Sequence, residues 1–215
     1  MSDPETDEGL ILRVHALTET SLVVRWLTRD SGRLATVARG ARQPKSPFLG
    51  RLDLFVSAQI SFQRARQSEL HTLREVSVLG RFPALASDYA RLAQASYAVA
   101  LIERVSEPET PVPELHALFG QFLAHLESAP AQSRSVYALE ARVLAAGGLD
   151  PVQAAGDLGP DARDLLQNLR DTPWPELAAL HPAGGAVREV NQRLQIQIAD
   201  AWGRVPRGRG EALRR

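Results

Sequence analysis

Eight basic side chains in the first third of the chain could bind phosphate groups. Arginine donates two parallel hydrogen bonds to phosphate oxygens, and lysine supplies a compact positive charge. Four of the eight lie within thirteen residues around a loop with glycine and proline, and the rest lie on or near adjoining predicted strands: Arg33, Arg39, Arg42 and Lys45, then Arg25, Arg51, Arg64 and Arg66. On one face of a domain they would line a groove that follows a nucleic-acid backbone.

Four aromatic side chains near these residues could stack on bases: Trp26, Phe48, Phe55 and Phe62. Trp26 and Phe62 lie inside apolar runs, which favours a place in the protein core. Phe48 lies in the loop between Pro47 and Leu49. We therefore predict that Phe48 is the side chain that stacks on a base.

The net charge of zero conceals a segregation of charge along the chain. Residues 9–82 carry twelve basic and five acidic side chains, a net charge of +7, whereas residues 83–203 carry a net charge of −7. Residues 1–8 hold four acids, and residues 204–215 have a net charge of +4. Arginine makes up nearly all of the basic residues, which a GC-rich genome explains as well as phosphate recognition does. The local field of the first part still favours a polyanionic partner.

The residue types that bind metals are scarce. The chain has no cysteine, so thiolate zinc sites, disulfides and cysteine nucleophiles are excluded. Of the five histidines, only His116 and His125 share a predicted helix, where nine residues turn about 900° and place them on opposite faces. We predict neither a metal nor a cofactor.

No pattern for catalysis is complete. The run from Gly40 to Ser46 resembles a phosphate-binding loop, but Pro44 replaces the glycine required before the lysine. Asp157, Asp161 and Asp164 could hold Mg²⁺ in a nuclease. Asp157 and Asp161 lie beside glycine and proline, however, where acids more often cap helices. We predict no catalytic residues and a protein that is not an enzyme.

The hydrophobic pattern changes its period near residue 83. Five β-type runs joined by turns come first and predict a small closed barrel of the OB or SH3 type. These runs cover residues 9–16, 22–28, 34–39, 52–62 and 73–79. Apolar residues then recur at three- and four-residue steps in helices, the first over residues 84–105. The predicted fold class is α+β, with a barrel followed by a helical bundle.

Four regions follow from this reading. Residues 1–8 are expected to be an acidic disordered leader, 9–82 the barrel, 83–203 the helical domain and 204–215 a basic flexible tail. No run approaches the length of a membrane span, and the polar N-terminus differs from a signal peptide. We expect a cytoplasmic protein.

The sequence from Leu10 to Ser46 resembles the start of the bacterial DNA repair protein RecO, a family of recombination mediators. The resemblance rests on three segments: Glu19-Thr20-Ser21, Gly32-Arg33-Leu34, and Ala38-Arg39-Gly40-Ala41-Arg42 with Lys45-Ser46 behind it. It is specific over residues 9–82 and extends to about residue 150.

The resemblance implies an N-terminal OB-fold, a helical C-terminal domain and no enzymatic turnover. It implies binding of single- and double-stranded DNA, strand annealing, and work at the nucleoid. The implied partners are RecR, the acidic C-terminal tail of single-stranded DNA-binding protein (SSB) and, indirectly, the recombinase RecA. Arg33, Arg39, Arg42 and Lys45 would then contact phosphates. Arg134 and Arg142 could form the basic rim of a site for the acidic tail, or be ordinary exposed arginines.

The sequence departs from the family at one point. Many members carry a four-cysteine zinc module in the C-terminal domain, which is absent or metal-free here because the chain has no cysteine. Three other functions stay open at this stage: an RNA-binding barrel protein, an adaptor that ignores nucleic acid, and a nuclease. The basic cluster argues against the adaptor.

Overall fold

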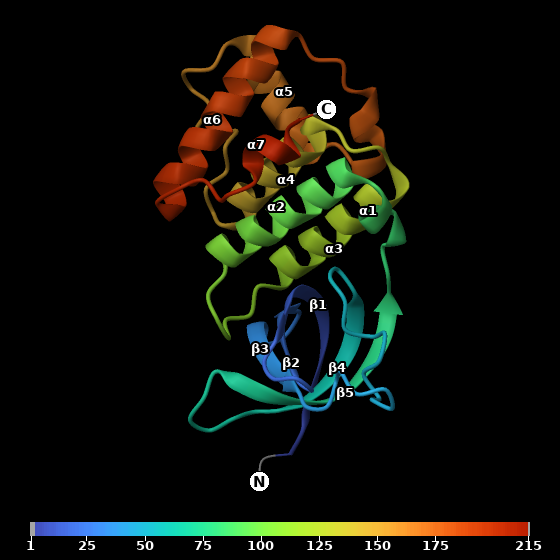
Figure 1. Ribbon diagram of the computed structural model, residues 1–215. Helices are drawn as coiled ribbons and strands as arrows, with labels where there is room; N and C mark the ends of the chain where they lie inside the picture. The colour runs from blue at the N-terminus through green and yellow to red at the C-terminus, as the bar shows by residue number, and fades with distance from the viewer. Residues whose placement is uncertain (1–2, 215) are drawn as a thin grey trace. The chain divides into compact units, whose positions relative to one another are not determined.

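The computed structural model describes residues 3–214 and divides the chain into two compact units. The first comprises the chain up to Phe82 together with Ser106–Gly120, and the second comprises Pro83–Val105 and the chain from Gln121 onward. Figure 1 shows strands in the first part of the chain and helices in the remainder. The predicted order of barrel and helices, and the α+β class, are confirmed.

Five strands close into the barrel of an OB-fold in the order β1-β2-β3-β5-β4. The strands are β1 (Glu5–Ala16), β2 (Leu22–Thr28), β3 (Gly32–Ala38), β4 (Ser57–Gln63) and β5 (Leu70–Gly80). Neighbours are antiparallel except for β3 and β5, which pair in parallel. Buried and less buried residues alternate along β3 and β4, as expected of strands with one face toward a core.

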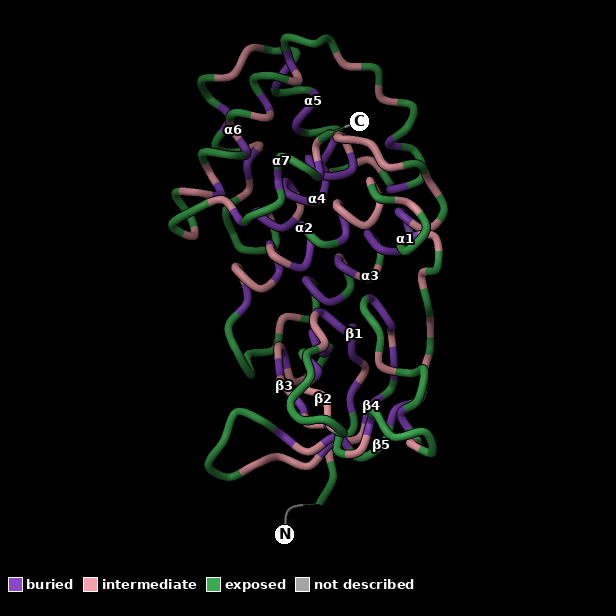
Figure 2. Tube along the Cα trace, viewed as in Figure 1, coloured by how far each residue is buried: buried purple, intermediate pink, exposed green. Residues whose placement is uncertain are grey.

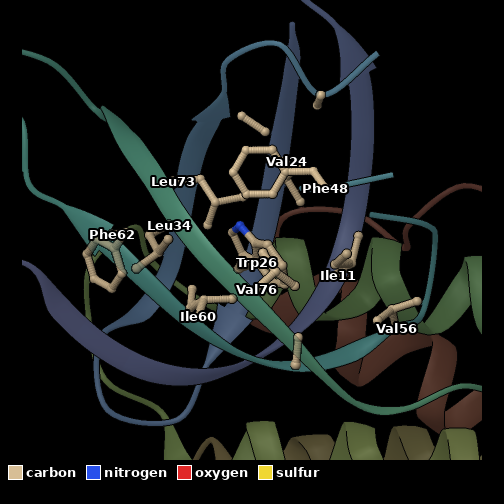
Figure 3. Close-up of a cluster of buried hydrophobic side chains, with 13 residues drawn as sticks. Ile11, Val24, Trp26, Leu34, Phe48, Val56, Ile60, Phe62, Leu73 and Val76 are labelled. Carbon is tan, nitrogen blue, oxygen red and sulfur yellow. The ribbon is translucent and has the colours of Figure 1, made fainter. Parts of the chain in front are cut away.

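Large apolar side chains fill the barrel. Trp26, Ile60 and Phe62 are almost completely buried there, and Figure 3 shows them converging with Phe48 and Leu73. The indole Nε1 of Trp26 donates a hydrogen bond to the Thr36 hydroxyl at 2.9 Å, which satisfies the only polar atom of that side chain. The prediction that Trp26 and Phe62 are core residues is confirmed.

The predicted acidic leader is wrong from Glu5 onward. Residues 5–8 form the start of β1 and pair with β4. The Asp7 carboxylate is buried and accepts backbone hydrogen bonds from Ser31 at 2.8 Å and Asp30 at 3.2 Å. A local count of acids could not show that this carboxylate holds the β2–β3 turn. Residues 1 and 2 of the predicted leader lie outside the described residues.

A segment beyond the predicted barrel also belongs to the first unit. Pro108 forms a parallel bridge with Arg33, and the Glu109 amide donates to the Arg33 carbonyl at 2.8 Å. Gly32 permits this contact: it has a φ of +73°, and a Cβ there would lie 2.0 Å from the Thr110 carbonyl oxygen. The division thus differs from the predicted boundary, which placed residues 83–203 in one domain.

The helices pack against one another through broad apolar faces. They are α1 (Pro83–Ser87), α2 (Tyr89–Val105), α3 (Pro113–Ser128), α4 (Ser133–Ala146), α5 (Pro160–Asp171), α6 (Gly184–Trp202) and α7 (Arg209–Ala212), with a 3-10 helix, η1 (Trp174–Ala179). Figure 2 shows α4 buried over most of its length, whereas buried and exposed positions alternate along α6. The predicted helix over 84–105 is two helices, because the Asp88 carboxylate caps α2 by accepting the Ala90 and Arg91 amides. None of the helices described here has the length and apolar character needed to cross a membrane.

The predicted flexible tail is wrong for residues 204–214. This segment contains α7, whose Arg209 pairs with the buried Glu140 of α4 at 2.7 Å. Gln94 of α2 donates to the Ala212 carbonyl at 3.0 Å. Glycine and arginine content predicts disorder only when no partner is available, and here a buried carboxylate fixes the segment. Arg215 lies outside the described residues.

Candidate nucleic-acid interface

The outer surface of β1, β2 and β3 carries basic side chains. Because side chains alternate along a strand, Arg25 of β2 and Arg33 of β3 point away from the core filled by Trp26 and Leu34. Arg13 lies directly opposite Arg25 in the β1–β2 register, just after a bulge. Like charges placed opposite each other cost stability. The β1–β2 register places two arginines next to each other on the barrel.

The loop after β3 adds three exposed cations, Arg39, Arg42 and Lys45. The loop is tied to the β1–β2 turn, because the Arg42 amide donates to the Thr20 carbonyl at 3.0 Å and its guanidinium donates to the Thr18 carbonyl at 3.2 Å. The structure thus holds the loop against the turn rather than leaving it free. We call Arg25, Arg39, Arg42 and Lys45 the basic face.

A groove runs over β2 and β3, the strands on which OB-folds bind oligonucleotides. Its walls come from these strands, the β4–β5 loop and the segment after α2: Val23, Arg25, Arg33, Leu34, Ala35, Glu69, Leu70, Pro108 and Glu109. Cations and apolar side chains suit a strand of nucleic acid, which offers phosphates and base faces. The two glutamates in the lining, Glu69 and Glu109, would repel a phosphate close to them.

The nine predicted DNA-binding residues differ in their exposure and in their contacts within the unit. Six are exposed: Arg25, Arg39, Arg42, Lys45, Arg51 and Arg66. Of these, Arg51 donates to the Val76 carbonyl at 2.9 Å. Arg33 is half-buried and donates to the Ser106 carbonyl at 3.0 Å.

The remaining two of the nine, Arg64 and Phe48, are not exposed. Arg64 forms ion pairs with Glu5 at 2.9 Å and Glu109 at 2.7 Å. Phe48 is only 7% exposed and belongs to the barrel core, so the prediction that it stacks on a base is wrong. The prolines around Phe48 indicate a loop, but only the fold shows that the loop turns its aromatic ring inward.

Arg13 and Glu109 are the residues that the sequence analysis missed. Arg13 could have been found from its alternation with the apolar residues of β1. Glu109 had no sequence signal, because it lies 45 residues from Arg64 and 38 from His71. Contacts at such separations follow from the closed fold and not from a local pattern.

The two arginines predicted for a partner site lie in the helical unit. Arg142 donates to the Arg170 carbonyl at 3.1 Å, and its guanidinium lies 4.0 Å above the Trp174 ring. Burial lowers the pKa of Arg142. These contacts assign Arg142 to the support of η1 and not to an exposed rim. Arg134 donates to the carbonyls of Leu177 and Ala178 and lines a pocket with Tyr137.

The three aspartates considered for a nuclease do not form a metal site in the described residues. Residues 3–214 contain no group of three or more His, Asp or Glu side chains placed to hold an ion. Asp157 pairs with Arg193, and the residue that caps α5 is Gly159. The expectation that Asp157 and Asp161 cap a helix is therefore wrong as well.

A four-cysteine zinc module does not fit this chain, which has no cysteine. Residues 149–160 are held by other means. Asp150 pairs with Arg170 at 2.5 Å, Ala155 is buried, and the Gly159 amide donates to Glu189 at 3.0 Å. Packing and ion pairs therefore hold this segment.

Comparison with known families bears on most of the chain. The model of the recombination protein O N-terminal domain matches residues 1–82, and that of the C-terminal domain matches residues 86–155. A DNA repair protein RecO from Xanthomonas oryzae pv. oryzae (strain PXO99A) is 31% identical over 192 residues, which cover 88% of this chain and 74% of the relative. The chain belongs to the RecO family.

Other relatives of the same name align with this chain over fewer residues. The protein from Anaeromyxobacter sp. (strain Fw109-5) is 34% identical over 160 residues, or 72% of this chain and 62% of the relative. That from Syntrophus aciditrophicus (strain SB) is 31% identical over 144 residues, or 67% and 56%. The alignments thus span about three fifths of the length of these two RecO proteins. The barrel that carries the basic face lies wholly within the matched N-terminal model.

Proposed function

We propose that this protein is a recombination mediator that binds single- and double-stranded DNA through its barrel and anneals complementary strands without enzymatic turnover. Membership of a family named for DNA repair and recombination supports the class of function. The observation that carries the proposal is the basic face, where three exposed cations of one anchored loop lie beside the strands that OB-folds use for oligonucleotides.

Annealing follows from charge neutralisation. Two single strands repel each other through their phosphates, and a protein that neutralises phosphates on both strands lowers that repulsion. Nothing on the barrel resembles a helix that would enter a major groove, so binding depends on the backbone and shows little sequence preference. Because chromosomal DNA would be its substrate, we expect the protein in the cytoplasm, at the nucleoid.

We extend the proposal to the protein partners RecR, the acidic C-terminal tail of SSB and, indirectly, RecA. A pocket in the helical unit supports the tail as a ligand. Tyr137, Leu165, Leu169 and Val187 line it together with the polar side chains of Ser133, Arg134 and His181. A pocket of mixed polarity that includes an arginine suits a peptide that ends in apolar and acidic groups.

The test measures fluorescence anisotropy of a labelled single-stranded oligonucleotide between 50 and 200 mM salt. The variant Arg39→Ala/Arg42→Ala removes two cations of the basic face. Loss of two phosphate contacts is expected to weaken binding and to reduce the slope of log K against log salt by about 1.4 units. Arg163→Ala/Arg188→Ala is the control, because it removes two exposed arginines from α5 and α6 at the same cost in net charge.

The outcomes are distinct. Binding that the control keeps and the loop variant loses supports DNA on the barrel, and annealing of complementary strands is then measured with the same pair. Equal losses in both variants would show that net charge alone drives binding. Tighter binding to RNA of the same sequence would indicate recognition of the 2′-hydroxyl and oppose the DNA function.

A further inference from the structure

Glu109 adopts a backbone conformation that costs energy. Its φ is +53°, in the left-handed region that non-glycine residues seldom occupy because it is strained for them. The amide of Glu109 donates to the Arg33 carbonyl at 2.8 Å, and the adjacent Pro108 bridges to β3. These contacts hold the strained residue in place and aim its side chain at the barrel.

The Glu109 carboxylate contacts two nitrogen donors of the barrel. Its Oε2 lies 2.7 Å from Arg64 Nη1, and its Oε1 lies 3.2 Å from His71 Nε2. The glutamate is 39% exposed, whereas His71 is 2% exposed. The partly exposed Glu109 carboxylate therefore contacts one donor that is partly buried, Arg64, and one that is buried, His71.

The site has more donors than the carboxylate satisfies. His71 Nδ1 accepts the Ala65 amide at 3.2 Å, so the proton of the neutral ring is on Nε2. That Nε2 is buried and lacks the alignment of a hydrogen bond to Glu109. Arg33 Nε is buried as well and makes no hydrogen bond. Unsatisfied buried donors are costly, and a better-fitting anion would lower that cost.

We infer that Arg64 and His71 form a binding site for a backbone phosphate of single-stranded nucleic acid, next to the groove that Arg33 lines, and that Glu109 occupies this site when no nucleic acid is bound. Glu109 and Arg33 line the same groove as Arg25, so a strand that follows the basic face reaches the site. The phosphate displaces the carboxylate from Arg64 Nη1 and His71 Nε2. This inference rests on the proposed function.

The test compares Glu109→Gln with Glu107→Gln in the full chain, using the salt-dependent anisotropy assay. Both variants remove one negative charge, and Glu107 is an exposed residue two positions away. Release of the site adds one phosphate contact, so Glu109→Gln is expected to bind more tightly at 50 mM salt and to steepen the salt slope by about 0.7 units. Glu107→Gln is expected to leave the slope unchanged.

A double-mutant cycle assigns the gain to Arg64. Arg64→Gln is expected to weaken binding less in the wild type, where Glu109 holds the guanidinium, than in the Glu109→Gln background. Thermal melting followed by tryptophan fluorescence checks that each variant folds. Glu109→Gly is the second variant if Glu109→Gln melts early, since glycine adopts a positive φ without strain.

Two results overturn the inference while the proposed function stands. One is a wild type that binds single-stranded DNA while Glu109→Gln matches Glu107→Gln in affinity and slope. The other is an equal effect of Arg64→Gln in both backgrounds. A wild type that binds no nucleic acid at 50 mM salt defeats the proposed function itself.

Discussion

The buried pair of Arg209 and Glu140 predicts how the C-terminal segment is held. Arg209 Nε lies 2.7 Å and Nη2 2.8 Å from the two carboxylate oxygens of Glu140, and the Tyr97 hydroxyl donates to the same carboxylate at 2.5 Å. Glu140 is fully buried and the arginine side chain is 8% exposed. We choose Arg209→Met because methionine keeps much of the apolar stem and removes the charge.

The expected loss of stability is large because the charged Glu140 carboxylate stays buried without its partner. Removal of one partner from a buried ion pair costs about 3–5 kcal/mol, since the remaining charge has lost its compensation. Burial alone would lower the pKa of Arg209, but hydrogen bonds and the charge of Glu140 outweigh it and raise the pKa. Burial, reinforced by Glu140, also raises the pKa of the Tyr97 hydroxyl. Tyr97 therefore stays a neutral donor and cannot replace the cation.

Urea unfolding at pH 7, followed by tryptophan fluorescence, measures the loss. With a denaturant slope of about 2 kcal/mol per molar, the midpoint of the helical unit falls by roughly 2 M. Arg214→Met is the control, because Arg214 and Glu211 lie 3.9 Å apart at exposed positions and such pairs contribute about 0–1 kcal/mol. Arg209→Met/Glu140→Leu is expected to recover most of the loss, since it leaves no buried charge.

A loss for Arg209→Met no larger than that for Arg214→Met would refute this reasoning. It would mean that water reaches Glu140 and that the segment around α7 is attached only weakly. A double variant as unstable as the single one would place the stabilisation in the other contacts of Arg209, such as that to Asn191 at 2.8 Å.

Two further predictions concern a glycine and a histidine. Both Gly32 and Gly50 have a positive φ, so alanine at either position should destabilise the barrel, at Gly50 by about 1–2 kcal/mol. The loss for Gly32→Ala should be larger, because only at Gly32 does a Cβ meet the Thr110 backbone. Hydrogen exchange at the Glu109 amide should then speed up only in Gly32→Ala, and equal exchange in both variants would contradict the clash. Burial and then the charge of Arg142 lower the pKa of His125 below its ordinary value. The unfolded chain therefore binds the proton more readily, and the free energy of unfolding falls as pH drops below about 6.5, by up to about 1.4 kcal/mol per pH unit until the folded-state pKa is reached. Urea titrations at pH 7 and 5.5 should show a smaller decrease for His125→Gln, and an unchanged decrease would exclude this histidine as a cause.

The periodicity of the sequence was sufficient to predict the barrel, the change to helices near residue 83 and the core positions of Trp26 and Phe62. Alternation with period two and stripes with period 3.6 are local consequences of backbone geometry, so a window of ten residues reveals them. The exposed cations of the basic face were likewise evident from composition and turn residues. Local patterns failed for Phe48 and for the two terminal segments.

Only the tertiary structure decided which charges are available to a ligand. Arg25, Arg39 and Arg64 look equivalent in the sequence, but Arg64 alone is held by two carboxylates, one from the start of β1 and one from a segment that follows α2. The same holds for the C-terminal arginines, of which Arg209 is buried against Glu140. Sequence determines how many charges a segment carries, whereas closure of the barrel and packing of the helices determine which of them meet a partner. Electrostatic contacts depend on distance in space, and residues 45 or 69 positions apart become neighbours only through the fold.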